Sequence, residues 1–441
     1  MSNPIQLITA RRFAPLFFAQ LFGAFNDQFL KMALITIVTW GSLDVFGLKP
    51  AIIVPIAGTV FTLPFFFGCA LAGQVSDKYD KALVLLRVKQ AEILIMILAA
   101  IGFLLESSTL LLLTLAMMGA QSAFFSPTRN AVLPQWLKPK ELITGNALIN
   151  GFVAVSILLG QVLGVLLIMK TGGPKFVAAI LLIFAILGWL AIRPAPPAPS
   201  ENPDVKINYN LFTEIFHTLG FAYRDQKVFK PMLGTAWYYW LSAGVLILMP
   251  AFIKENLHYD STVLVLVLAI FTVGALIGAF TCMAVPKRKE SIGVSAVGAM
   301  GVAIFTFDMY LVGNGPHWLG FDATLLSNKG EAILGTAKNF IDNPDSRRFM
   351  IGLFGSAISA SLFVIPLNAM AQSRATPMHR AKLLAAGALM INVSTSIVQL
   401  LIAGMGYTSI PMHFPFLVIS IISALIAVYA LHRARLARST P

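Results

Sequence analysis

Twelve apolar stretches dominate this sequence, and each is long enough to cross the hydrocarbon core of a bilayer, which takes about 20 helical residues. They fall into two sets of six, separated by polar segments. The first set occupies 13–42, 50–74, 83–105, 108–126, 144–169 and 175–193. The second set occupies 229–253, 260–285, 291–313, 349–372, 381–407 and 411–432. Backbone groups in lipid must be hydrogen-bonded internally, so this pattern predicts an all-α membrane protein with 12 transmembrane helices in two six-helix halves.

The composition supports this class. The chain is 57% hydrophobic and 12% charged, whereas soluble domains carry about 25% charged residues. Cys69 and Cys282 lie in separate apolar runs, so we expect neither a disulfide nor a metal cluster. The net charge of +13 is spread over many short segments. A membrane surface therefore explains this charge, and we expect no nucleic-acid partner.

Two polar regions divide the chain. Residues 193–203 read RPAPPAPSENP, which predicts a linker because proline interrupts helices. Residues 211–227 mix apolar and charged side chains, as expected for a helix in the membrane interface. We therefore predict an N-terminal bundle over 1–193, a cytoplasmic linker with an amphipathic helix over 194–228, and a C-terminal bundle over 229–441.

The C-terminal bundle contains a long polar loop over 313–348, predicted to be periplasmic. Its stretch 325–341 is either part of a tolerated insertion or a short helix lying over the mouth of a cavity.

The distribution of basic residues predicts the orientation. Most of the 32 Lys and Arg residues fall on the side that contains both termini, and basic residues near span ends stay in the cytoplasm. The first apolar run follows Arg11 and Arg12 and exceeds signal-peptide length, so we interpret it as a retained span. We expect a multi-pass protein of the bacterial inner membrane with both termini cytoplasmic.

The turn after the second span reads GQVSDKYDK from Gly73 to Lys81. This G-x-x-x-D-[KR]-x-x-[KR] pattern resembles the signature of the major facilitator superfamily. The resemblance implies a cytoplasmic latch between the halves, formed by Gly73, Asp77, Lys78, Lys81 and Arg129. Glycine permits close helix approach, and the acid can accept hydrogen bonds from a helix amino terminus.

The corresponding place after the eighth span keeps a glycine and a basic cluster. Gly278 is followed by Lys287, Arg288 and Lys289, but Cys282 stands where the acid would be. We interpret this as a decayed second copy of the latch, as expected for a duplicated fold.

The first span carries an unusual set of polar residues. Gln20, Asp27 and Lys31 share one helical face, and Asn26 lies beside them. Charges at this depth cost several kcal/mol, on the order of 2.5–3.5 on insertion scales, so they normally face protein or a wet cavity. Asp27 is the best candidate for a functional residue. A structural ion pair between Asp27 and Lys31 is the alternative.

Three motifs narrow the family. The motifs AFNDQFLK, GAQSAFFSPTRNAVLPQWLKPKELITGNALIN and FVIPLNAMAQ resemble the bacterial lysophospholipid transporter family, whose members stand alone or are fused to an acyltransferase. The resemblance implies import, by flipping, of lysophosphatidylethanolamine and related lysolipids for reacylation. It also implies roles for Asp27 in the first span, for Ser126, Pro127 and Arg129 at the exit of the fourth, and for Pro366, Leu367 and Asn368 in the tenth.

The seventh span departs from this family. Residues 232–252 contain no basic side chain where the family places an arginine, and instead hold Trp237, Tyr238, Tyr239 and Trp240. A lipid cation could meet these aromatic faces, or the four residues could form an interfacial belt.

Other polar residues of the spans either line a cavity or bond helices together. We interpret Arg87, Lys89 and Glu92 as headgroup contacts at the start of the third span and assign no function to Asp308. The complete set of expected substrate-binding residues is Asp27, Gln20, Asn26, Lys31, Gln121, Trp237, Tyr238, Tyr239, Trp240, Asn368 and Gln372.

The sequence contains no Walker A, HExxH or GxSxG motif, so we expect a gradient-driven transporter rather than an enzyme, with no cofactor or metal. Its expected partners are the lysophospholipid substrate, membrane lipids and an acyltransferase, and the expected state is a monomer. An exporter of drugs, siderophores or peptides with the same fold is one alternative, because fold does not fix substrate. A membrane scaffold that docks an acyltransferase without transporting anything is another.

Overall fold

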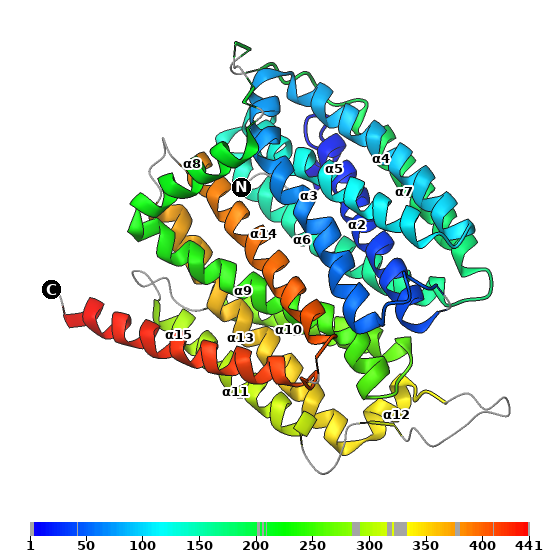
Figure 1. Ribbon diagram of the computed structural model, residues 1–441. Helices are drawn as coiled ribbons and strands as arrows, with labels where there is room; N and C mark the ends of the chain where they lie inside the picture. The colour runs from blue at the N-terminus through cyan, green and yellow to red at the C-terminus, as the bar shows by residue number, and fades with distance from the viewer. Residues whose placement is uncertain are drawn as a thin grey trace. The chain divides into compact units, whose positions relative to one another are not determined.

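The structure is a computed structural model that describes residues 4–41, 43–200, 203–204, 207–208, 210–284, 292–314, 320–321, 333–374, 380–408 and 410–439. Within these residues the chain forms twelve long α-helices, three short ones and one π-helical turn (Figure 1). The helices before residue 200 are α1 Pro4–Thr9, α2 Ala14–Trp40, α3 Pro50–Lys78, α4 Lys81–Leu104, α5 Ser108–Trp136, α6 Pro139–Ile168 and α7 Gly173–Ile192. The later helices are α8 Leu211–Arg224, α9 Gln226–Ala251, the π-turn η1 Phe252–Asn256, α10 Ser261–Ala284, α11 Ile292–Asn314, α12 Ala337–Asp342, α13 Pro344–Arg374, α14 Arg380–Met405 and α15 Phe414–Ser439.

The predicted all-helical membrane fold is confirmed. Eleven helices in the described part of the chain are long and apolar enough to cross a membrane. The twelfth expected span is α4, which has 24 residues but carries Lys81, Arg87, Lys89 and Glu92 in its first half. These charges set α4 apart from the other eleven, although it packs along α5 and α7 as a full-length helix.

Several helix boundaries differ from the sequence-based ranges: α3 ends at Lys78 rather than 74, α6 begins at Pro139 rather than 144, and α15 ends at Ser439 rather than 432. The fourth span does not end at residue 126, because α5 continues through Pro127 and Pro134 to Trp136. Membrane helices tolerate proline where neighbouring groups satisfy the freed backbone carbonyl. The tenth span begins at Pro344 rather than 349, because its first turn is polar and escapes a hydropathy-based boundary.

The first compact unit comprises Met1–Leu48 and Ala57–Phe216. In it α2 packs along α6 and α7, and α4 packs along α5 and α7. Phe25, Phe29 and Leu181 belong to its main apolar core. The core therefore surrounds the middle of α2, where the polar residues of the first span also lie.

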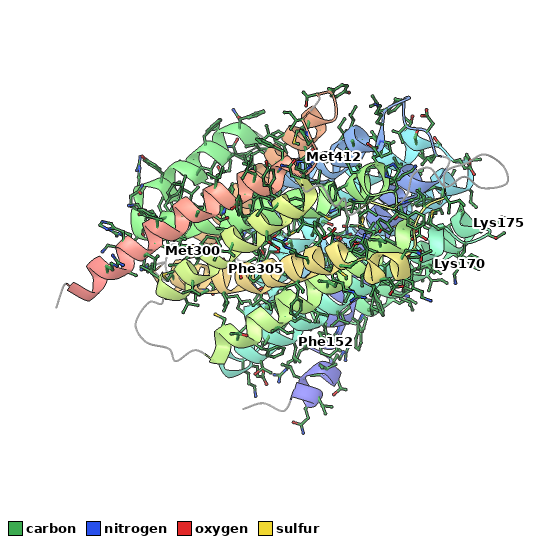
Figure 2. The ribbon with its side chains drawn as sticks, turned by 90° about the horizontal axis from the view of Figure 1, so that it is seen from below. Phe152, Lys170, Lys175, Met300, Phe305 and Met412 are labelled. Atoms are coloured by element: carbon green, nitrogen blue, oxygen red, sulfur yellow. The ribbon has the colours of Figure 1, made fainter. Side chains whose placement is uncertain are left out.

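The second unit comprises Lys49–Ile56 and His217–Pro441. Here α11 packs against α13 and α15, while α9 packs along α13 and α14. Phe305 of α11, labelled in Figure 2, fits against Gly355 of α13, where an added Cβ would lie 2.4 Å from the ring. The first turns of α3 belong to this unit, and the backbone N–H of Ala51 donates to Glu255 Oε1 at 3.3 Å.

Asp308, to which the sequence assigned no role, bonds an arginine. It lies in α11 and accepts hydrogen bonds from Arg348 of α13, with Nε 3.0 Å from Oδ1. The Nη2 of the same guanidinium also bonds Oδ1. This ion pair joins the two helices near the loop that connects them.

The described ends of the long loop are anchored to the turn after α9. The N–H of Phe321 donates to Leu257 O at 2.8 Å, and that of Gly335 donates to His258 O at 2.9 Å. The buried ring of Phe340 meets Tyr259 edge-on, with ring centroids 5.0 Å apart. Of the stretch 325–341, residues 325–332 lie outside the described residues, and both interpretations of it stay open.

Candidate functional site

A buried ion pair lies at the centre of the first unit. Lys89 Nζ is 2.6 Å from Glu92 Oε2, and the side chains are 1% and 0% exposed. Asn26 Nδ2 of α2 donates to Glu92 Oε1 at 3.4 Å, and Gln121 Nε2 of α5 donates to Glu92 Oε2 at 3.3 Å. Glu92 thus accepts hydrogen bonds from three helices, which offsets the high cost of burying its charge.

The residues around Lys89 stabilise its ammonium group and leave space for it. Lys89 Nζ lies 4.9 Å from the centre of the Phe125 ring, within the range of a cation–π interaction. Gly23 of α2 leaves room for it, since a Cβ there would be 2.4 Å from Nζ. The residue at position 23 therefore has to be small.

The interpretation of Lys89 and Glu92 as headgroup contacts is wrong. The third span begins at Lys81, so both residues lie more than two turns inside α4, on its packed face. Arg87 is the exposed residue of the three, and its Nη1 donates to Gln90 Oε1 at 3.0 Å. The ion pair belongs to the interior of the unit.

A cavity of about 140 Å³ lies beside this pair. It is bounded by α2, α3, α4 and α5, and its polar lining includes Gln20, Asp27, Ser122, Ser126 and Arg129. Ser122 Oγ donates to Asp27 Oδ2 at 3.1 Å. Within the described residues, the buried atoms Asp27 Oδ1 and Gln20 Oε1 have no hydrogen-bond partner. Unsatisfied buried acceptors beside a cavity indicate a place where a ligand could bind.

The remaining predicted residues of the first span lie elsewhere. Asn26 is fully buried, and its Nδ2 also donates to Leu181 O of α7 at 3.1 Å, which fixes α2 against α7. Lys31 is not among the residues that line the cavity. The described residues contain no contact between Asp27 and Lys31 within 4.0 Å. The two opposite charges nevertheless attract each other, so the ion pair stays open as an alternative. Asp27 also accepts the hydrogen bond from Ser122.

The four aromatic residues of α9 divide into two pairs. Trp237 and Trp240 stack with ring centroids 4.8 Å apart and line one groove of the second unit. Tyr238 and Tyr239 meet edge-on at 5.1 Å. The two tryptophans therefore share one helix face.

The two predicted residues of the tenth span differ in their surroundings. Asn368 Oδ1 accepts a hydrogen bond from Thr235 Oγ1 of α9 at 3.1 Å, which joins α9 to α13. Gln372 is exposed one turn later. Asn368 thus contributes to helix association.

The signature residues surround the junction of α3 and α4. Asp77 is exposed in the last turn of α3 near Lys78, and the Lys81 side chain is fully buried at the start of α4. An added Cβ at Gly73 would meet no atom within 4 Å, and the helix approach expected there stays a prediction. Gly119 provides the contact between α5 and α3, since a Cβ there would lie 2.0 Å from Phe61 O.

Asp80, which sequence reasoning missed, caps α4. Its Oδ1 accepts hydrogen bonds from the N–H groups of Ala82 at 2.8 Å and Leu83 at 3.1 Å. Its Oδ2 accepts one from Ala198 N at 3.2 Å. A carboxylate at a helix amino terminus is stabilising, and this one also ties the segment after α7 to α4.

The decayed second copy is described only in part. Gly278 permits close packing of α10 on α13, since a Cβ there would be 2.5 Å from Ile358 O. Lys287, Arg288 and Lys289 lie outside the described residues.

Two units of long membrane helices, one of them enclosing a buried charged cluster beside a polar cavity, are typical of a polytopic transport protein. Residues 16–343 match the family model of the Major Facilitator Superfamily. The chain therefore belongs to this superfamily, and it is a membrane transporter of that type.

Comparisons with individual proteins and solved structures find distant relatives of this chain. The chain is 23% identical over 364 residues to the lysophospholipid transporter LplT of Serratia proteamaculans, covering 81% of this chain and 78% of that protein. A crystal structure of a POT family transporter in complex with 5-aminolevulinic acid superimposes with a TM-score of 0.71 at 13% identity, covering 95% of each chain. The human organic anion transporter MFSD10 superimposes with a TM-score of 0.66 at 13% identity, covering 95% of this chain and 99% of that one. Identities this low show the shared fold alone.

Proposed function

We propose that this chain moves lysophospholipids, such as lysophosphatidylethanolamine, across the bacterial inner membrane from the outer to the inner leaflet. The two helical units would open alternately to each side, as other transporters built from repeats do. The similarity to the Serratia transporter and the three span motifs support this substrate class. The distribution of basic residues supports cytoplasmic termini.

The observation that carries the proposal is the partly satisfied carboxylate of Asp27. Its Oδ2 is held by Ser122, while its buried Oδ1 has no hydrogen-bond partner in the described residues. The ammonium group of an ethanolamine headgroup is a suitable counter-ion for this oxygen. Arg129 lines the same cavity and could pair with the phosphate. Charges of both signs in one cavity suit a zwitterionic headgroup.

The size of the cavity limits what it can hold. At about 140 Å³ it is smaller than the ~300–1,000 Å³ typical of small-molecule sites. It therefore suits a headgroup, and the acyl chain would lie outside it. In this proposal the latch residues take part in the conformational change and do not bind the substrate. They are Gly73, Asp77, Lys78 and Lys81.

The test is uptake of labelled lysophosphatidylethanolamine into spheroplasts that express the wild type, Asp27→Asn or Asp308→Asn. Asp308 provides a matched control, because it is an acid within a candidate membrane span that pairs with Arg348 and does not line the cavity. We expect Asp27→Asn to abolish uptake and Asp308→Asn to retain it. Equal uptake with and without the protein would refute the transport function.

Two outcomes concern narrower parts of the proposal. Full uptake by Asp27→Asn would remove the headgroup site while leaving the transport function. An acyltransferase that binds this chain equally well with or without Asp27, in the absence of uptake, would favour the scaffold alternative.

A further inference from the structure

A long groove follows α15 in the second unit. A cavity of about 800 Å³ is lined by α9, α11, α13, α14 and α15 near residues 226–240 of α9. A second cavity of about 430 Å³ continues between α9, α14 and α15 toward residue 248. Trp240 lines both cavities. The groove therefore extends along most of α9.

The groove arises from a difference in packing between the two units. In the first unit the first long helix, α2, packs along the last long helix, α7. In the second unit the corresponding first helix, α9, packs along α13 and α14 but meets α15 at only a few residues. α15 is held instead by α11. The space between α9 and α15 is the result.

The walls of the larger cavity are apolar. The stacked rings of Trp237 and Trp240 form part of one wall, and Phe363, Leu367 and Ile426 form others. Leu233 and Tyr429 line it and are also exposed, at 55% and 53%. The cavity is therefore accessible from the surface of this unit.

One end of the same cavity is strongly basic. Four basic side chains line it: Lys227 and Lys230 at the start of α9, Arg374 at the end of α13 and Arg433 near the end of α15. The Arg374 Nη1 donates to Lys227 O at 3.1 Å, which holds this guanidinium at the rim. No Asp or Glu occurs among the described residues of the lining. This end therefore carries an excess of positive charge.

We propose that this groove binds an anionic glycerophospholipid of the surrounding membrane, with its phosphate at the basic end and an acyl chain between α9 and α15. Basic pockets between membrane helices bind anionic headgroups, and arginine matches the geometry of phosphate. The volume of about 800 Å³ lies within the usual range for ligand sites. The site is separate from the Asp27 cavity and goes beyond the proposed transport function.

The groove contains its own reporters, because two of the six tryptophans of the chain line it. The purified full chain is reconstituted into phosphatidylcholine vesicles. A small fraction of either brominated phosphatidylglycerol or brominated phosphatidylcholine is then added, and quenching of tryptophan fluorescence is measured. We expect stronger quenching by the anionic lipid, and we expect Trp237→Phe/Trp240→Phe to lose this excess.

The charge requirement is tested with two matched double variants. Lys230→Gln/Arg433→Gln removes two rim charges, and Arg224→Gln/Arg435→Gln removes two exposed charges that do not line the groove. We expect the first to lower the preference for the anionic lipid about thirtyfold, which corresponds to about 2 kcal/mol. The control variant and Lys230→Arg/Arg433→Lys should keep it.

Three outcomes would overturn the proposal. One is equal quenching by the two brominated lipids in the wild type, and another is an undiminished preference in Lys230→Gln/Arg433→Gln. The third is displacement of the lipid by inorganic phosphate, which would show that the acyl chain contributes nothing. None of these measurements depends on transport, so the groove and the proposed substrate can fail separately.

Discussion

Lys89 and Glu92 form an ion pair in which Nζ lies 2.6 Å from Oε2 and both side chains are almost completely buried. The pair is three residues apart on α4, so the helix itself brings the charges together. Its burial makes each charge depend on the other, because a single unpaired charge in this position is poorly solvated. Two distinct substitutions separate the role of charge from that of volume.

The first prediction concerns loss of one partner. Glu92→Gln removes the carboxylate that directly contacts the buried Lys89 ammonium and should lower the free energy of unfolding by about 3–5 kcal/mol. Lys89→Met/Glu92→Leu removes both charges while keeping the volume, so it should be close to wild type in stability. Thermal unfolding of the detergent-solubilised protein measures both effects. A double variant as unstable as Glu92→Gln would contradict the charge-based explanation.

The second prediction compares two glycines. Gly119→Ala places a Cβ 2.0 Å from Phe61 O, a backbone atom that can move only if α3 shifts. Gly73→Ala meets no atom within 4 Å. We expect Gly119→Ala to lower the unfolding temperature markedly and Gly73→Ala to leave it unchanged. Equal destabilisation by the two substitutions would show that the approach of α3 to α5 has been misassigned.

The sequence predicts the helices well because apolar length is a local property. Every long helix was expected, and errors occurred where polarity or proline obscured an end, as at Pro127 in α5 and at Pro344 in α13. An acid within an apolar run is also visible locally, which is how Asp27 was found. The same criterion would identify Lys89 and Glu92 as a buried pair if the start of α4 were known.

The partners of these residues could not be predicted in the same way. Ser122 lies 95 positions from Asp27 in the sequence, and nothing in its neighbourhood marks it as a hydrogen-bond donor to that acid. The role of Asp80 likewise depends on Ala198, which is 118 positions away. The groove beside α15 depends on how whole helices pack against one another. The spacing of apolar residues along a single helix does not predict such packing.

The third prediction concerns the cap of α4. Asp80→Ala removes the acceptor for the N–H groups of Ala82 and Leu83, a loss that typically costs about 1 kcal/mol. It also releases Ala198 N. Amide hydrogen exchange at Ala82, Leu83 and Ala198 should become faster. Asp77→Asn, three residues earlier, should leave these three amides protected, and faster exchange in both variants would point to a general loosening of the turn.

The last prediction tests the orientation of Asp27 and rests on the proposed substrate. Ser122→Ala removes the hydrogen bond to Asp27 Oδ2. Hydrogen bonds to charged groups contribute about 1.5–3 kcal/mol, so the apparent affinity for lysophosphatidylethanolamine should fall about tenfold or more. Ser122→Thr keeps the hydroxyl and should restore most of this affinity.

The control is Ser126→Ala, which removes a hydroxyl from the same cavity. This hydroxyl is not bonded to Asp27 in the described residues, so its loss should have a smaller effect. Concentration-dependent uptake separates the variants, because misorientation of the acid raises the KM for the lysolipid while leaving the amount of folded protein unchanged. If Ser122→Ala and Ser126→Ala raise the KM equally, the cavity responds to polarity in general and the contact between Ser122 and Asp27 has no special role.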